Sequence, residues 1–504
     1  MQAPDAEADP NGRGRLSTAD LRDLCVGLFG IQVVWGLQNV NTSRVFQTLG
    51  AEVERLPMLW IAAPATGLLI QPLVGHFSDR VTWRWGRRKP FMVTGAVLTA
   101  GAMLAMSIAR TLPAAVGALW LLTASVNVVM QPFRALTADR LGEEQRAQGF
   151  AMQVVFIGAG AVFASALPWM LANWFGIAGT AGADRLAPSI RIAFQVGAAA
   201  LIATVGWTVL RAKEAPAPCP DRSLGRAGDH VAGAPRRTGP LWLSGGALLA
   251  VVAAAGGLRR EVFLLAGLAA AYGGMRLAGE RGRRDRRARS APVAIADDIA
   301  RMPQALRRLA LTQFLTWFGL FAMWIYAVPA IALRHFGAVA PGSAAYAVGG
   351  DWVGILFAIY DGVAAAVATI LPAVARRIGL RACHAACLGL GALGMTGLLL
   401  LNSPGLLWLP AVGIGVAWAS ILSTPYVIVA DAAPATKVGM YMGIHNIFVV
   451  LPQLVAAATL GWALDRLFGG RADAMLALAA GAMGLAAVSC IGLPSRPRLC
   501  NKLH

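Results

Sequence analysis

Residues 75–90 read GHFSDRVTWRWGRRKP and join two long apolar runs, at 57–77 and 90–109. Each run has about 20 residues, which is enough for a helix to cross a hydrocarbon core of roughly 30 Å. The joining stretch holds five basic residues, and short basic loops of this kind stay in the cytoplasm. The turn ARRIGLR at 375–381 repeats the pattern late in the chain. The two turns predict a membrane protein made of two related halves.

Apolar runs of similar length recur along the whole chain. They lie at 24–46, 57–77, 90–109, 113–137, 149–172 and 192–211 in the first half, and at 309–333, 350–373, 382–401, 405–430, 438–463 and 473–493 in the second. We therefore expect an all-α membrane protein with two six-helix halves, residues 1–211 and 309–504, around a central cavity. Because the basic turns mark the cytoplasmic side and the number of spans is even, both termini are expected in the cytoplasm.

The composition excludes a soluble protein. Of 504 residues, 57% are hydrophobic and only 14% are charged, so lipid must be the solvent for most of the chain. The net charge of +19 is concentrated in short segments between the apolar runs. This makes the surface of the lipid bilayer, rather than nucleic acid, the expected partner. Acidic residues precede the first run and no small-residue cleavage site follows it, so we expect the first helix to be retained.

A connector at 212–308 separates the two halves and begins with a stretch rich in Pro, Gly and Arg. Within it, two further apolar runs at 241–256 and 262–278 are joined by a short turn. We interpret 241–278 as an extra helical hairpin that crosses the membrane. Each run is slightly short for a span, so the alternative is a hairpin in the interface or on the outside of the bundle.

The basic loop at 75–90 has a spacing that predicts a conformational latch. Glycines permit close helix approach, and an acid at a helix end can pair with nearby cations in one state of the protein. The residues assigned to this gating loop are Gly75, Asp79, Arg80, Gly86, Arg87 and Arg88. The alternative is that the cations only anchor the loop on the cytoplasmic side.

The pattern GxxxDR followed by GRR resembles the loop motif of the major facilitator superfamily. The longer stretch SDRVTWRWGRRKPF is similar to the sucrose:proton symporters and their bacterial relatives. Further resembling segments are FGIQVVWGLQN, LWIAAPATGLLIQPLVGHFSDR, MQPFRALTAD, DWVGILFAIYDGVAA and GMYMGIHNIFVVLPQ. The resemblance covers both halves and is closest to a bacterial branch linked to maltose and related glucosides. It implies a bacterial inner-membrane transporter that carries a sugar, such as the disaccharides maltose or sucrose, by alternating access as a functional monomer.

Polar and aromatic residues inside the apolar spans mark a candidate cavity for the sugar. Amides hydrogen-bond hydroxyl groups, and aromatic faces stack on a pyranose ring. The predicted substrate-binding residues are Gln32, Gln38, Asn39, Asn127, Gln131, Arg134, Gln153, Trp317, Trp324, Tyr326, Trp418, Asn446 and Gln453, and Asn41, Gln313, Thr316 and Ser420 follow the same pattern. The alternatives are interhelical hydrogen bonds for the amides and membrane-interface positions for the rings.

The coupling to protons departs from what the resemblance implies. In the sucrose symporters an Arg in the context of Arg134 works with an Asp eleven residues earlier, where this chain has Thr123. Asp361 and His445, where relatives have Asn and Phe, are the predicted replacement site for proton coupling, since an acid retained within a span usually has a cavity or a partner. The alternatives are that Asp361 acts as a hydrogen-bonding equivalent of Asn and that Arg134 only reaches toward water.

The sequence does not point to an enzyme, a metal or a cofactor. The six His are scattered without an HExxH spacing, and the six Cys form no CxxC pair. Two rival functions remain open. One is a passive sugar uniporter, and the other is a facilitator-like factor that delivers a pigment or assists assembly. Sodium is the alternative coupling ion.

Overall fold

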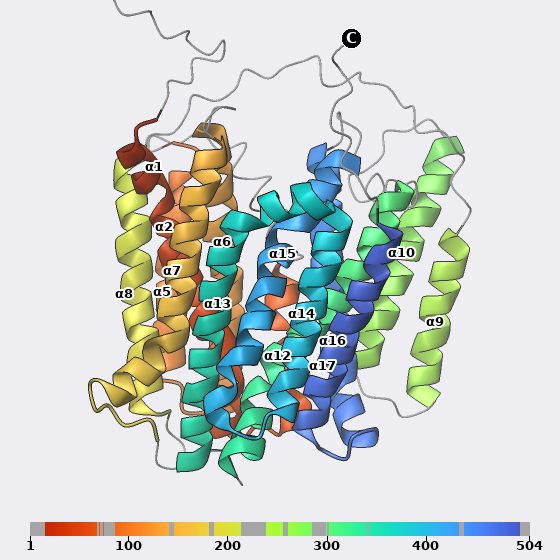
Figure 1. The fold of residues 1–504 in the computed structure, drawn as a ribbon. Coiled ribbons are helices and arrows are strands. Elements are labelled where there is room, and N and C mark those ends of the chain that lie inside the picture. The colour runs from red at the N-terminus through yellow and green to blue at the C-terminus, as the bar shows by residue number, and fades with distance from the viewer. Residues whose placement is uncertain are drawn as a thin grey trace, which may run out of the picture.

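The computed structural model describes residues 16–67, 70, 74, 86–140, 146–180, 186–212, 238–255, 261–284, 299, 302–338, 340–341, 343–432 and 438–493. Every named element in this part of the chain is a helix, and the long helices run side by side through one bundle (Figure 1). Eleven helices of the described residues are long and apolar enough to cross a membrane. The predicted all-α membrane protein is therefore confirmed.

The helices of the first half follow the predicted spans. They are α1 (Thr18–Cys25), α2 (Gly27–Thr48), η1 (Val53–Arg55), α3 (Leu56–Leu59), α5 (Lys89–Ser107), α6 (Leu112–Arg140), α7 (Arg146–Asn173) and α8 (Pro188–Arg211). The chain enters α1 through a capping box, in which the Ser17 and Asp20 side chains satisfy each other's backbone N–H groups. α1 and α2 together make the first candidate span, Thr18–Thr48. The predicted span at 57–77 lies only partly within the described residues.

Two helices of the second half, α12 (Gln304–Phe336) and α13 (Ala344–Ile378), are much longer than a bilayer requires. They are followed by α14 (Leu380–Leu400), η4 (Pro404–Leu406), α15 (Trp408–Ala432), α16 (Val438–Arg466), α17 (Ala472–Ser489) and η6 (Cys490–Gly492). α12 has 33 residues and α13 has 35, against about 20 for one crossing. Gly337, with φ of 63°, ends α12 in the left-handed conformation that glycine adopts most easily. The long helices therefore carry side chains beyond the apolar core.

The connector contains a helical hairpin of α9 (Gly239–Ala255) and α10 (Glu261–Arg284). The Trp242 and Tyr272 rings meet edge to face at 5.4 Å between the two helices. α10 packs against α16, and α9 is the outermost helix at the right of the bundle (Figure 1). The predicted helical pair is thus present beside the bundle. Its crossing of the membrane and the three-part division of the chain stay predictions.

The two halves meet most extensively where α7 packs against α13, and α2 also packs against α12 and α3 against α16. At Gly354 on α13, a Cβ atom would lie 2.5 Å from the backbone carbonyl oxygen of Ser165 on α7. No side chain larger than hydrogen fits there without moving one of the two helices. At Gly362, two turns further along α13, the nearest atom to a Cβ is a Val162 methyl carbon at 3.4 Å, which is an ordinary contact.

The substitution Gly354→Ala is expected to destabilise the protein by overpacking this interface, at a cost of about 1–3 kcal/mol. Gly362→Ala is the matched control, since it adds the same methyl group to the same helix where space exists and raises helix propensity. Thermal unfolding in detergent should give a lower midpoint for Gly354→Ala than for wild type and Gly362→Ala. Equal midpoints for the two variants would show that α7 and α13 adjust without cost.

Candidate functional site

Three tryptophans form one cluster in the second half. Trp317 and Trp324 lie on α12, and Trp418 lies on α15. Their ring centroids are 5.8 to 6.2 Å apart, and each pair is arranged edge to face, which is a favourable geometry for aromatic rings. The indole N–H of Trp324 donates to the Tyr360 hydroxyl on α13 at 3.2 Å. The predicted aromatic residues on different helices therefore come together.

Asp361 lies beside this cluster, at the junction of the two halves. Its side chain interacts with the Trp418 and Ser165 side chains, and the residue is only 8% exposed. Ser165 lies on α7 in the first half, whereas Trp418 lies on α15 in the second. A buried carboxylate that contacts both halves is sensitive to any movement of one half against the other. This position also makes it sensitive to a ligand bound between them.

His445 occupies a second buried polar cluster, on the inner side of α16. Its Nε2 atom lies 3.5 Å from the Gln313 side-chain amide of α12, and its ring packs edge to face on Tyr426 at 4.9 Å. Turning the Gln313 amide would place its oxygen opposite the imidazole N–H, since amide orientation is assigned from the hydrogen-bond network. Among the described side chains, no hydrogen bond joins His445 to Asp361. The two residues therefore have separate surroundings.

Several predicted amides use their donors within their own helices and leave acceptors unused. The side-chain amides of Asn41, Asn127 and Gln453 each donate to the backbone carbonyl four residues earlier. The side-chain oxygens of Gln38, Asn41 and Gln313 are buried without a hydrogen-bond partner among the described residues. Because an unsatisfied buried oxygen is costly, Gln38 and Asn41 favour a water molecule or a ligand hydroxyl nearby, whereas the Gln313 oxygen could accept from His445 if the amide is turned.

The remaining predicted substrate-binding residues lie on α2, α6, α7, α12 and α16. Tyr326 is fully buried on α12, while the half-buried residues are Gln32, Asn39, Gln131, Gln153 and Asn446. Arg134 lies within α6, but its side chain is outside the described part. Of the gating loop, Gly86, Arg87 and Arg88 precede α5, whereas Gly75, Asp79 and Arg80 lie outside the described residues. The roles assigned to all of these residues stay predictions.

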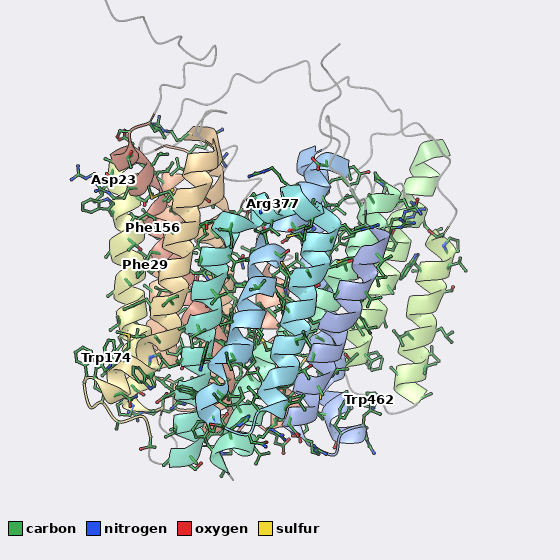
Figure 2. The ribbon with its side chains drawn as sticks, in the orientation of Figure 1. Asp23, Phe29, Phe156, Trp174, Arg377 and Trp462 are labelled. Atoms are coloured by element: carbon green, nitrogen blue, oxygen red, sulfur yellow. The ribbon has the colours of Figure 1, made fainter. Side chains whose placement is uncertain are left out.

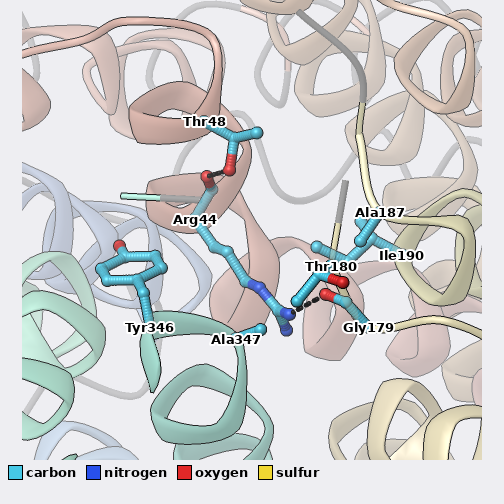
Figure 3. A pocket seen from close by; sticks show the side chains of 8 residues that line it. All are labelled: Arg44, Thr48, Gly179, Thr180, Ala187, Ile190, Tyr346 and Ala347. Atoms are coloured by element: carbon cyan, nitrogen blue, oxygen red, sulfur yellow. Dashed lines mark hydrogen bonds between the residues drawn. The ribbon is translucent and has the colours of Figure 1, made fainter. Parts of the chain in front are cut away.

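A buried ion pair that the sequence analysis missed joins the two halves. The Arg44 guanidinium on α2 donates to the Asp351 carboxylate on α13 at 2.5 Å, with both side chains at most 10% exposed. The same guanidinium donates to the Gly179 carbonyl oxygen, in the segment between α7 and α8, at 2.9 Å (Figure 3). One arginine thus links α2 to elements of both halves.

Two further hydrogen bonds join the halves here, and a third, within the first half, holds one of their donors. The Tyr346 hydroxyl on α13 donates to the Gln47 side chain on α2. The Ser43 hydroxyl donates to the Ile325 carbonyl oxygen of α12 at 2.9 Å and accepts the Trp60 indole N–H at 3.1 Å. We call the pairs Arg44–Asp351, Gln47–Tyr346 and Ser43–Ile325 the gate. They hold the end of α2 against α12 and the start of α13.

The gate lies at one end of the bundle. α2 ends and α13 begins at this end, which we call the lower face; Trp174 and Trp462 lie near it in Figure 2, while Asp23 and Arg377 lie at the opposite, upper face. The sequence contained a signal for the gate, namely Arg44 as the one charge of the run at 24–46 and Asp351 as one of two acids in the run at 350–373. Pairing them was not predicted because they are 307 residues apart.

Two cavities are found beside the gate. The smaller, lined by Arg44, Gly179 and Tyr346, has a volume of about 10 Å³, which is room for one water molecule. The larger has a volume of about 270 Å³ and includes Asp351 and Trp352 in its wall. Neither cavity is lined by the tryptophan cluster or by Asp361.

The fold and the gate define a polytopic α-helical membrane protein with two halves held together at one face. Residues 24–457 match the sequence profile of the Major Facilitator Superfamily, and the chain belongs to this family. The predicted family is thus confirmed. Members of this family are transporters rather than enzymes, which also confirms the expectation that the chain is not an enzyme.

Curated relatives match parts of the chain at low identity. The sucrose transport protein SUT1 of Oryza sativa subsp. japonica is 28% identical over 211 residues, which cover 37% of this chain and 39% of the relative. The general alpha-glucoside permease of Schizosaccharomyces pombe is 32% identical over 163 residues, covering 29% of this chain and 30% of the relative. The chain therefore matches less than half the length of either protein.

Solved structures match over nearly the whole chain. The POT family transporter PepTSo superposes with a TM-score of 0.66 at 13% identity, over 95% of this chain and 98% of the other. The nucleoside transporter NupG gives a TM-score of 0.60 at 11% identity, over 94% of this chain and 98% of the other. These similarities confirm the fold.

Proposed function

We propose that this protein is a secondary transporter that carries a sugar or glycoside, most favourably a disaccharide such as maltose or sucrose, by alternating access with proton coupling. The observation that carries the proposal is the tryptophan cluster with Asp361 beside it at the junction of the halves. Aromatic rings and a carboxylate are the groups that bind the apolar faces and the hydroxyls of a sugar. The similarity to a sucrose transport protein and an alpha-glucoside permease supports the same substrate class.

The gate supplies one half of an alternating-access cycle. While Arg44 and Asp351 are paired, α2 is held against α13 and the lower face is closed. Separating them would expose two charges whose pairing is strong only inside the protein, where the effective dielectric is low. When the lower face opens, each of these two side chains must therefore replace the other with water or substrate. This gives the transporter two distinct states rather than a continuous range.

Proton coupling is assigned to Asp361, with His445 as a second candidate group. Because this carboxylate contacts side chains of α7 and α15, its protonation changes contacts in both halves. His445 lies against Gln313 on α12 and belongs to a different cluster, so it would act through α12 rather than by direct contact with Asp361. Sodium is the alternative ion. We further propose that the protein is a functional monomer in a bacterial inner membrane, with both termini and the upper face in the cytoplasm.

Uptake into proteoliposomes tests this function. The purified protein would be offered a panel of labelled mono- and disaccharides, with and without imposed pH and sodium gradients. We expect one sugar class to accumulate when a pH gradient is present. Equilibration without accumulation would instead establish a passive uniporter. Failure to move any sugar, together with copurification of a membrane complex, would favour the assembly or pigment-delivery factor.

The substitution Trp418→Ala is expected to weaken sugar binding, because Trp418 contacts both other tryptophans and Asp361. Loss of one stacking ring is worth about 1.5 kcal/mol, which corresponds to about a tenfold higher Kd or KM. Trp418→Phe should retain much of the affinity. Trp408→Ala is the matched control, since Trp408 lies on the same helix but is 45% exposed. Equal KM values for Trp418→Ala and Trp408→Ala would remove the cluster from the substrate site.

A further inference from the structure

The larger cavity at the lower face has a wall with an unusual composition. It lies between the end of α7 with the segment after it, the end of α12 and the start of α13. Three aromatic rings and three polar side chains contribute to this wall, namely Trp169, Phe336, Trp352, Asn173, Thr180 and Asp351. Its volume is about 270 Å³. Because pockets for drug-sized ligands have volumes of roughly 300–1,000 Å³, this smaller cavity suits a ligand of one ring.

Asp351 connects this cavity to the gate. One carboxylate oxygen, Oδ1, accepts from Arg44. The other, Oδ2, lies 3.4 Å from where a Cβ of Gly179 would be. Gly179 also lines the cavity and accepts from Arg44. The cavity therefore contains a hydrogen-bond acceptor that belongs to the residue that closes the gate.

The aromatic rings of the wall are held in place by contacts outside the cavity. The Trp352 indole N–H donates to the Pro404 carbonyl oxygen, just before α15, at 3.0 Å. The Trp169 ring packs edge to face on Trp174 at 5.9 Å. Rings fixed in this way lose little conformational entropy when a ligand binds, and this favours affinity.

The charge of the cavity indicates which ligand it takes. Asp351 is the one charged residue in the described wall, and Arg44 already neutralises it. The site therefore attracts neither an anion nor a cation strongly. Aromatic walls together with amide, hydroxyl and neutralised carboxylate groups match a neutral polyhydroxylated ring.

We propose that this cavity is an accessory sugar site, in which one pyranose ring docks at the lower face before the gate opens. The inference rests on the proposed function, because it assigns a second site to the same substrate class. A sugar hydroxyl that donates to Asp351 Oδ2 takes up part of the negative charge of the carboxylate that Arg44 binds through Oδ1. Docking therefore weakens the Arg44–Asp351 pair and couples the arrival of substrate to the release of α2.

Protection of an introduced thiol tests the site directly. Thr180 is an exposed residue of the wall and is replaced by cysteine. In the same protein Cys219 and Cys500 are replaced by serine. The other four cysteines are buried. A membrane-impermeant maleimide labels the thiol, and methyl α-glucoside and maltose are the probes. Leu467→Cys is the matched control, at an exposed position of the same face after α16. We expect the sugars to slow labelling of Thr180→Cys about threefold or more and to leave Leu467→Cys unchanged.

Second substitutions then separate the two sites. Adding Trp352→Ala is expected to raise the sugar concentration for half-maximal protection about tenfold. Trp352→Phe should change this concentration little, because the aromatic ring is kept although the N–H bond to Pro404 is lost. Trp462→Ala, at the same face, should have no effect. Trp418→Ala should leave the protection of Thr180→Cys intact. Sugar transport by wild type without this protection overturns the accessory site alone, whereas protection without any transport overturns the proposed function alone.

Three outcomes would contradict the sugar assignment. Protection that is lost with Trp418→Ala would place its origin in the tryptophan cluster of α12 and α15. A loss as large with Trp352→Phe as with Trp352→Ala would show that the N–H bond to Pro404, rather than the ring surface, matters. The third outcome is protection that requires phosphatidylethanolamine in the vesicles, that is not seen with phosphatidylglycerol alone, and that added sugar does not change. This result would assign the cavity to a lipid headgroup.

Discussion

The substitution Asp351→Asn is expected to shift the protein strongly toward states in which the lower face is open. It leaves the buried guanidinium of Arg44 without its counter-ion, while the volume of the side chain is kept. Removing one partner of a buried ion pair costs about 3–5 kcal/mol. Since 1.4 kcal/mol corresponds to a tenfold change in an equilibrium constant, the ratio of open to closed states should rise at least about a hundredfold.

Thiol labelling measures this shift. Ala347 lines both cavities and is buried in the closed state, so Ala347→Cys should react much faster with an impermeant maleimide when Asp351→Asn is added. Asp473→Asn is the matched control, because it breaks an ion pair with Arg471 at the same face. The Arg471 side chain is 71% exposed, and ion pairs in contact with water contribute little. Exchanging the charges, with Arg44→Asp and Asp351→Arg together, should restore part of the protection. Unchanged labelling in Asp351→Asn would mean that the ion pair does not close the lower face.

The substitution Asp361→Asn is expected to abolish accumulation of sugar on a pH gradient. Asparagine keeps the shape and a hydrogen-bond acceptor for Trp418 and Ser165, but it cannot bind and release a proton. Exchange of labelled for unlabelled sugar requires no net proton movement. We therefore expect counterflow in the Asp361→Asn variant to be close to wild type while accumulation falls to the equilibrium level.

Two controls sharpen the test of Asp361. Ser165→Ala removes one neighbour of the carboxylate and should preserve accumulation, though with altered pH dependence. Asp431→Asn removes another acid of the same half, beyond the apolar part of α15, where partial desolvation raises the pKa of the carboxyl group. It should accumulate sugar as wild type does. Accumulation by Asp361→Asn at the wild-type level would assign the proton to another group.

The positions of the helices could be predicted from the sequence alone. The apolar run at 382–401 became α14 (Leu380–Leu400), and the run at 473–493 became α17 and η6. Within a membrane every backbone group must be satisfied inside its own segment, so length and hydropathy decide where a helix forms. The basic loop at 75–90 likewise predicted the family that the profile match established. The pattern of amides and rings also identified the tryptophans of α12 and α15.

The pairing of side chains between helices was decided only by the tertiary structure. Arg44 and Asp351 were visible as charges within apolar runs, and Gln47 and Tyr346 were equally visible, but the residues of each pair lie about 300 positions apart. Asp361 was singled out, yet its contact with Ser165 of the other half was not. Helix formation depends on hydrogen bonds four residues apart, which a local pattern records. The gate depends on which helices cross and at what height, and this is set by packing of the whole bundle.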